Sequence, residues 1–145
     1  MNMIGDVPAG IDEAALTNVV HTFYGKVRDD ADLGPVFAHA ISDWPHHLGK
    51  MVDFWSSVML TTGRYKGNPV MMHLKHKPHI TPALFDRWLA LWGETTDELL
   101  PPEAAAALQA RAARIAESLQ LALFFRLDGQ PPSRPAPVAD LPAGA

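Results

Sequence analysis

The chain has 145 residues, of which 48% are apolar, a formal net charge of −4 and no cysteine. These values fit one globular domain and exclude disulfides, thiolate metal sites, thiol nucleophiles and a cofactor attached through cysteine. The acidic balance, without a basic patch, argues against a nucleic-acid partner. There is no apolar run of roughly 18 residues and no basic-then-apolar leader, so we predict a cytoplasmic protein that does not enter the membrane.

The first half of the chain shows the apolar spacing of helices, without the alternation typical of strands. One helix is predicted from Asp12 through Val27, and a polar break over 29–32 leads into a short helical turn over 33–37. Ser42 is predicted to cap a second long helix, with Asp43 and a tolerated Pro45 in its first turn. One apolar stripe along this helix is headed by a histidine and comprises His47, Met51, Phe54, Trp55 and Val58.

The second half begins with a break of two glycines and a proline over 61–69. The next segment, 70–76, forms at most about two helical turns, which is too short to be stable alone, so neighbours or a bound group must hold it. A helix that opens with Thr81 and Pro82 ends at Pro101, and a last helix begins near Glu103. We predict an all-α domain over 1–127 and a disordered tail rich in proline and alanine over 128–145.

The chain carries seven histidines, for which three interpretations compete. In the first interpretation, three of them, His21, His39 and His79, are exposed helical residues without a function. His73 and His76 stand at i and i+3 on one helical face, which suits a zinc or iron site. Against a metal site of that kind, no carboxylate or cysteine lies in the segment, and Pro78 stops the helix before a third ligand.

The third interpretation is a haem site, which needs one strong axial nitrogen, a slot of large apolar side chains and cations for the propionates. His73 supplies the nitrogen, and Lys50 and Arg64 supply nearby cations. The candidate slot residues are Phe37, Met51, Phe54, Val58 and Phe85. An aromatic stripe at helical spacing is also typical of a simple core, so spacing alone leaves all three interpretations open.

Between about residues 14 and 120, five segments of this chain follow one another in the order of a known family pattern, with suitable gaps between them. They read FYxKVR at 23–28, DLGPVF at 32–37, WxxHLxxMxxFW at 44–55, YxGxPxxxH at 65–73 and FxxWL at 85–89. Together they resemble a group III truncated haemoglobin, and the paired-glycine motifs of other truncated haemoglobin groups are absent. The resemblance implies a truncated globin fold, which is a two-over-two helical sandwich around non-covalently bound haem b. In that fold the proximal histidine lies on a short, loop-like segment.

The resemblance also implies roles for single residues. His73 is expected to bind the iron, with an acceptor on its other ring nitrogen that sets the tautomer. Tyr24 and Trp88 match the distal pocket, His47 matches the gate position, and Met51 is expected to pack over the iron-bound ligand. Tyr24 and Trp88 also fit the alternative of plain core residues. Lys50 is expected to meet a propionate, His76 and Arg64 are secondary candidates for the haem site, and His46 is expected on the surface.

The implied pocket predicts a function. Two hydrogen-bond donors, Tyr24 and Trp88, facing a negatively polarised O₂ ligand would slow its release on the order of 10²-fold. With His47 as the third catalytic candidate, such a protein is suited to NO detoxification or peroxidase-like chemistry rather than to transport. The expected partners of this monomer are O₂ or NO and an unidentified reductase. Two alternatives remain, a haem-based gas or redox sensor or haem-transfer protein without turnover, and a helical interaction module without a cofactor.

Overall fold

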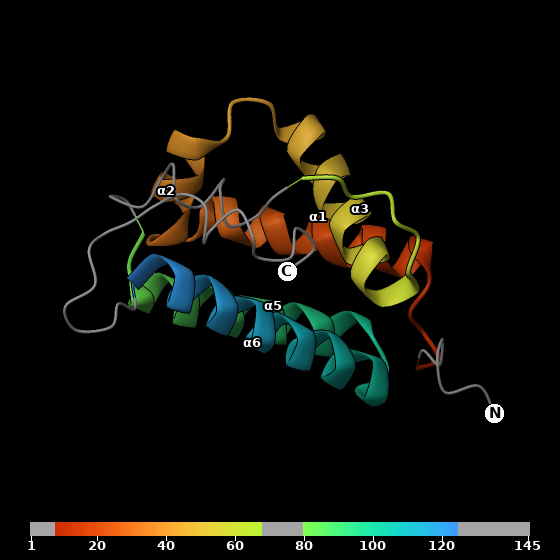
Figure 1. Ribbon diagram of the computed structural model, residues 1–145. Coiled ribbons are helices and arrows are strands. Elements are labelled where there is room, and N and C mark those ends of the chain that lie inside the picture. The colour runs from red at the N-terminus through yellow and green to blue at the C-terminus, as the bar shows by residue number, and fades with distance from the viewer. Residues whose placement is uncertain (1–7, 68–79, 125–145) are drawn as a thin grey trace.

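The computed structural model describes residues 8–67 and 80–124, and Figure 1 labels its helices. The helices are α1 Glu13–Asp29, α2 Leu33–Ala40, α3 Trp44–Leu60, α5 Pro82–Leu99 and α6 Pro102–Phe124. Within these two ranges there is no strand, and no helix is long and apolar enough to cross a membrane. The predicted all-α fold is confirmed, whereas the predicted segment 70–76 and the predicted tail over 128–145 lie outside the described residues.

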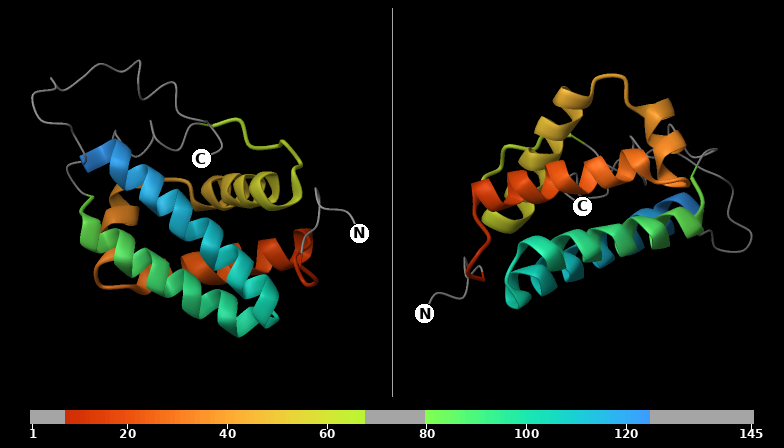
Figure 2. Two further views of the ribbon diagram at one scale, coloured as in Figure 1. Left: turned by 60° about the horizontal axis from the view of Figure 1, so that its bottom comes forward. Right: turned by 180° about the vertical axis from the view of Figure 1, so that it is seen from behind.

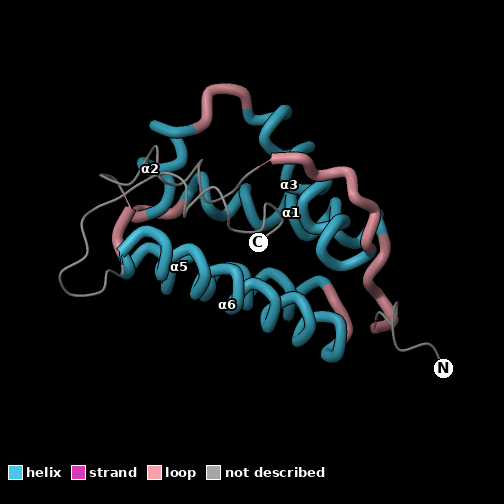
Figure 3. The backbone as a smooth tube through the Cα atoms, in the orientation of Figure 1, coloured by secondary structure: helices cyan, strands magenta, loops and turns pink. Residues whose placement is uncertain are grey.

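The helices form two layers (Figures 1 and 2). α5 and α6 run antiparallel, side by side, in one layer. α1 and α3 pack against each other in the other layer, where α2 covers one end of α1. α1 also packs on α5, so this contact joins the layers. The tube in Figure 3 shows the loop after α3 turning back along that helix.

The core where the two layers meet is built on tryptophan. Trp55 of α3 and Trp92 of α5 are 2% and 1% exposed, and their stacked rings have centroids 4.5 Å apart. Trp92 also stacks on Trp88, with centroids 6.0 Å apart, and its indole N–H donates to the Leu108 carbonyl of α6 at 3.2 Å. One side chain therefore connects three helices, of which α3 lies in the other layer.

The helix starts follow local capping rules. Asp12 caps α1 by accepting the Ala15 N–H at 2.8 Å. The predicted cap of α3, Ser42, is wrong by one residue, because Asp43 has the extended backbone of a cap and its carboxylate accepts the His46 N–H at 3.1 Å. Pro82 opens α5 in the way the sequence predicts, since a proline in the first turn loses no helical hydrogen bond.

The loop over 61–67 is tied back onto α3 by hydrogen bonds. The fully buried Ser56 hydroxyl bonds to Thr62 and accepts from Arg64, both at 3.0 Å. The Ser57 hydroxyl accepts the Tyr65 N–H at 2.9 Å. The chain therefore leaves the described part of the molecule from a fixed position beside the second half of α3.

Asp30 links the α1–α2 turn to α5. Its carboxylate accepts the N–H groups of Asp32 and Leu33 at 3.0 and 2.9 Å, and it pairs with the Arg87 guanidinium at 2.7 Å. The hydrogen bond from Arg87, with further help from the two backbone N–H groups, holds the pKa of the Asp30 carboxyl below its usual range. The contact holds α5 in register with α1 one residue before Trp88.

We expect Asp30→Ala to lower the free energy of unfolding by about 1–2 kcal/mol at neutral pH, since two capped N–H groups and an ion pair are lost. The folded-state pKa of Asp30 is lowered, so its stabilisation is present above the unfolded-state pKa of about 3.9 and is lost as the pH falls through the folded-state value. Urea unfolding at neutral pH and near pH 3 measures this, with the exposed Asp29→Ala as control. An equal difference between Asp30→Ala and wild type at both pH values would contradict the assignment.

Candidate functional site

Tyr24 lies at the centre of an aromatic group that combines α1, α2 and α3. Its side chain is 5% exposed on the inner face of α1. The centroid of its ring lies 4.8 Å from that of Phe23, 5.0 Å from His47, 5.7 Å from Phe37 and 6.0 Å from Trp44. The phenol is therefore a polar group in a largely aromatic environment, where hydrogen bonds are strong and missing partners are costly.

The Trp88 indole of α5 lies within hydrogen-bonding reach of the Tyr24 hydroxyl, with its N–H as the donor. Burial raises the pKa of the Tyr24 phenol far above its usual value, and this hydrogen bond opposes the rise only in part. The phenol therefore keeps its proton across the physiological pH range. An indole can only donate, so the contact with Trp88 does not use the Tyr24 proton. The buried O–H thus remains available as a donor.

Trp88 is held from two sides. Its ring stacks on Trp92 with an interplanar angle of 5°, and it meets Phe23 edge to face with centroids 5.8 Å apart. The preceding residue, Arg87, pairs with Asp30. These contacts leave the half-buried indole little freedom, so its N–H is presented to Tyr24 by the fold itself.

His47 enters the group from the first turns of α3. Its ring meets Tyr24 at 87°, lies 6.4 Å from Phe37 and meets Trp44 at 90° with centroids 5.5 Å apart. Trp44 and His47 are three residues apart on one helix, so they share a face. The histidine therefore lies between α1 and α2, beside the phenol.

The structure brings four predicted site residues together, namely Tyr24, Phe37, His47 and Trp88. Met51 and Val58, further along α3, are half-buried against the core, and Lys50 is exposed on the same helix. Two predicted slot residues occupy other parts of the core, with Phe54 packed on Tyr65 and Phe85 packed on Phe124. The predicted ligand His73, together with His76 and His79, lies outside the described residues. His46, His21 and His39 are exposed, as predicted.

Arg64, the secondary candidate for a propionate, has protein partners. Its guanidinium pairs with Glu13 and Asp53 and donates to Ser56. The hydrogen bond to Glu13 is the largest cause of its raised pKa. Propionate binding by Arg64 remains a prediction, and a propionate there would compete with two carboxylates.

Two members of the aromatic group, Phe23 and Trp44, were not among the predicted site residues. Trp44 stands in the same motif as His47, and the spacing of three residues between them was a usable signal. Phe23 lies on the predicted core stripe of the first helix, where nothing separates a residue that supports the site from ordinary core. Both become visible only when α1 and α3 are brought together.

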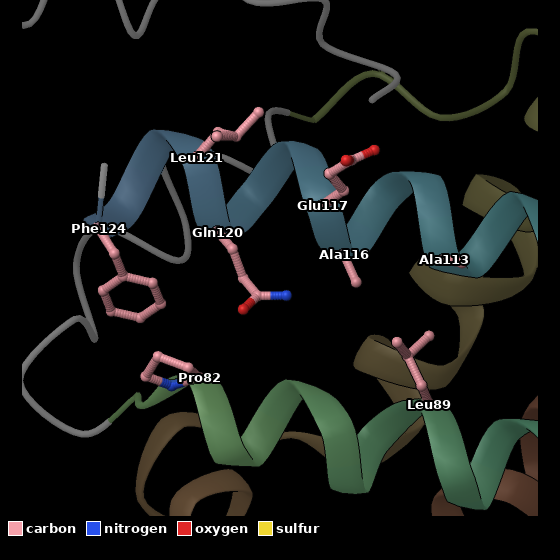
Figure 4. Close-up of a pocket in the computed structure, with 8 residues that line it drawn as sticks. All are labelled: Pro82, Leu89, Ala113, Ala116, Glu117, Gln120, Leu121 and Phe124. Atoms are coloured by element: carbon pink, nitrogen blue, oxygen red, sulfur yellow. The ribbon is translucent and has the colours of Figure 1, made fainter. Parts of the chain in front are cut away.

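An open, mainly apolar groove of about 460 Å³ lies between α5 and α6 (Figure 4). Pro82 of α5 faces Gln120 and Phe124 of α6 across it, while Leu121 points away. The full lining is Pro82, Leu89, Ala113, Ala116, Glu117, Gln120, Leu121 and Phe124. None of the predicted site residues lines this groove, so we place the candidate site at the aromatic residues around Tyr24. This Tyr24 group comprises Phe23, Tyr24, Phe37, Trp44, His47 and Trp88.

The donors of the Tyr24 group fit the ligand-binding side of a haem pocket. A buried O–H that donates to none of the described residues suits a small, negatively polarised ligand, and aromatic rings surround it. Comparison with known proteins agrees with this fit.

No family model matches the chain. It is 33% identical over 118 residues to the group 3 truncated hemoglobin ctb of Campylobacter jejuni, a match that covers 79% of this chain and 92% of that protein. Among solved structures, the crystal structure of group III truncated hemoglobin from Campylobacter jejuni matches with a TM-score of 0.76 at 33% identity, over 82% of this chain and 96% of that one. The predicted truncated globin fold is confirmed, and the chain belongs to the group III truncated haemoglobins.

Proposed function

We propose that this protein binds haem b between the segment that carries His73 and the Tyr24 group, and that it holds O₂ tightly for reaction rather than for transport. Membership of the truncated haemoglobins implies haem and a diatomic ligand. The observation that most supports tight binding is the Tyr24 hydroxyl, which is buried and protonated. Its oxygen accepts the Trp88 N–H, and its proton has no acceptor among the described residues. His73 is the proposed iron ligand.

Haem, when bound, supplies an iron atom that binds a diatomic gas and shifts electron density from the iron to the gas. Tyr24 donates its O–H to that negatively polarised ligand. Trp88 acts through Tyr24, because an N–H donated to the phenol oxygen makes the phenol a stronger donor. This differs from the sequence prediction, in which both donors reach the ligand independently. His47, beside Tyr24, keeps its proposed role at the gate.

Slow release of O₂ leaves time for a second reactant. We propose NO as that reactant, with a separate reductase that returns the protein to the ferrous state. Tyr24, Trp88 and His47 hold and orient the ligand. Among residues 8–67 and 80–124, the charged side chain next to these rings is Arg28, whose guanidinium lies over Trp44. The proposed reaction combines O₂, NO and one electron from the reductase into nitrate.

Titration with hemin tests the haem site. Wild-type protein is expected to give a Soret band with saturable binding, and His73→Ala is expected to shift the band and weaken binding, because the iron loses its protein nitrogen. His21→Ala, at an exposed position of α1, is the matched control and should leave the band unchanged. A wild-type protein without a Soret band, or an unchanged band in His73→Ala, would refute the proposal.

Turnover is tested separately from haem binding. The O₂ complex is mixed with NO and a chemical reductant in buffer that holds excess O₂, and nitrate is measured together with recovery of the ferrous spectrum. Several equivalents of nitrate per protein would support the reaction. An O₂ complex that persists in NO would favour the alternative of a sensor or haem-transfer protein.

A further inference from the structure

Two pairs of residues on α1 and α3 contact one another. Tyr24 and Arg28 are four residues apart on α1, and Trp44 and His47 are three residues apart on α3, so each pair shares one helix face. Tyr24 contacts both His47 and Trp44, with centroids 5.0 and 6.0 Å apart. The guanidinium carbon of Arg28 lies over the Trp44 ring, 4.6 Å from its centroid. Trp44 in turn meets His47 at 90°.

Residues of α2 pack against both Arg28 and Trp44 and help to hold their contact. Gly34 of α2 packs on the Arg28 carbonyl so closely that a Cβ there would come within 2.8 Å of the oxygen. Phe37 stacks with Trp44 at an interplanar angle of 25°, which helps to set the plane of the indole. Within the described ranges Arg28 forms no ion pair, so its guanidinium is available for the cation–π contact with Trp44.

We propose that Arg28 and Trp44 form a latch that keeps the imidazole of His47 beside Tyr24 and so controls how often the gate opens. This inference rests on the proposed function, since it concerns the same pocket. Arg28 is exposed and Trp44 half-buried, so the latch lies on the solvent side of the histidine. Loss of the cation frees the indole to tilt, and the imidazole then loses one of its two perpendicular neighbours, while Tyr24 stays in place. Arg28 and Trp44 are thus positioning residues.

The competing account is that the cation merely stabilises the first turn of α3. The two accounts differ in what happens to a ligand in the pocket. If the latch positions His47, loss of the Arg28 cation changes the polar environment of the ligand. If it only stabilises the helix, thermal stability falls and the environment of the ligand stays as it was. Infrared spectra of the CO complex separate these outcomes, because the C–O stretching frequency falls when a hydrogen-bond donor faces the ligand.

The experiment uses full-length, haem-loaded ferrous protein under CO. Arg28→Gln keeps the shape of the side chain without its charge and should raise the ratio of the high- to the low-frequency C–O population roughly two- to fivefold. That range is the value of an exposed cation–π contact, about 0.5–1 kcal/mol, converted at about 1.4 kcal/mol per tenfold. Arg28→Lys keeps a cation and should restore the wild-type ratio. Arg114→Gln, an exposed arginine of α6, is the control.

A double-mutant cycle makes the test specific to the histidine. In a His47→Leu background, Arg28→Gln should leave the C–O bands unchanged, because the group that the latch positions is absent. Wild-type-like bands in Arg28→Gln, or the same shift with and without His47, would overturn the latch alone. A wild-type protein that forms no CO complex would overturn the proposed function and the latch with it.

Discussion

Replacing Tyr24 by phenylalanine is expected to speed the dissociation of O₂ from the ferrous protein about ten- to hundredfold. A hydrogen bond to a charged acceptor contributes about 1.5–3 kcal/mol, and about 1.4 kcal/mol corresponds to a factor of ten. The substitution removes only the hydroxyl and leaves the ring contacts with Phe23, Phe37 and His47 in place. Stopped-flow replacement of O₂ by CO gives the dissociation rate.

The other tyrosine of the chain, Tyr65, is the matched control. It is half-buried against Phe54 on the loop after α3, so Tyr65→Phe should leave the dissociation rate unchanged. Trp88→Phe should have a smaller effect than Tyr24→Phe, and the double variant should fall short of the product of the two effects. Non-additivity is expected because Trp88 donates to Tyr24 itself. A wild-type rate in Tyr24→Phe would rule out the hydrogen-bond argument.

Trp92→Ala is expected to lower the free energy of unfolding by about 3–5 kcal/mol, the range for removing a large aromatic side chain from a core. Trp92 is 1% exposed, stacks on both Trp55 and Trp88, and donates to the Leu108 carbonyl. The cavity would open where α3, α5 and α6 meet. Urea unfolding followed by circular dichroism measures the loss.

Two further variants serve as comparisons for the stability loss in Trp92→Ala. Trp92→Phe keeps a ring in the core and should cost less than Trp92→Ala, and Leu121→Ala, whose side chain is 54% exposed on α6, should stay within about 0.5 kcal/mol of wild type. Because a phenylalanine ring offers Trp88 a smaller stacking surface than an indole, O₂ dissociation in Trp92→Phe should also rise. Equal stability of Trp92→Ala and Leu121→Ala would contradict the role of Trp92 in joining the two layers.

The amino-acid sequence by itself determines the helices. Apolar spacing, turn residues and capping residues are local signals, and they place all five described helices with small errors such as Ser42 in place of Asp43. The resemblance to group III truncated haemoglobins further picks out Tyr24, His47 and Trp88, which the structure then brings together. The proposed ligand His73 rests on sequence alone, because it lies outside the described residues.

Only the tertiary structure decides how these side chains face one another. Trp88 donates to Tyr24 from 64 positions further along the chain, and Arg28 covers Trp44 from a different helix. Periodicity shows which residues share a face of one helix, but it does not show which face of α3 meets α1 or at what height along it. That choice is made by the packing of large side chains, here Trp55 and Trp92, which are buried where the two layers meet, and Trp88, which stacks on Trp92.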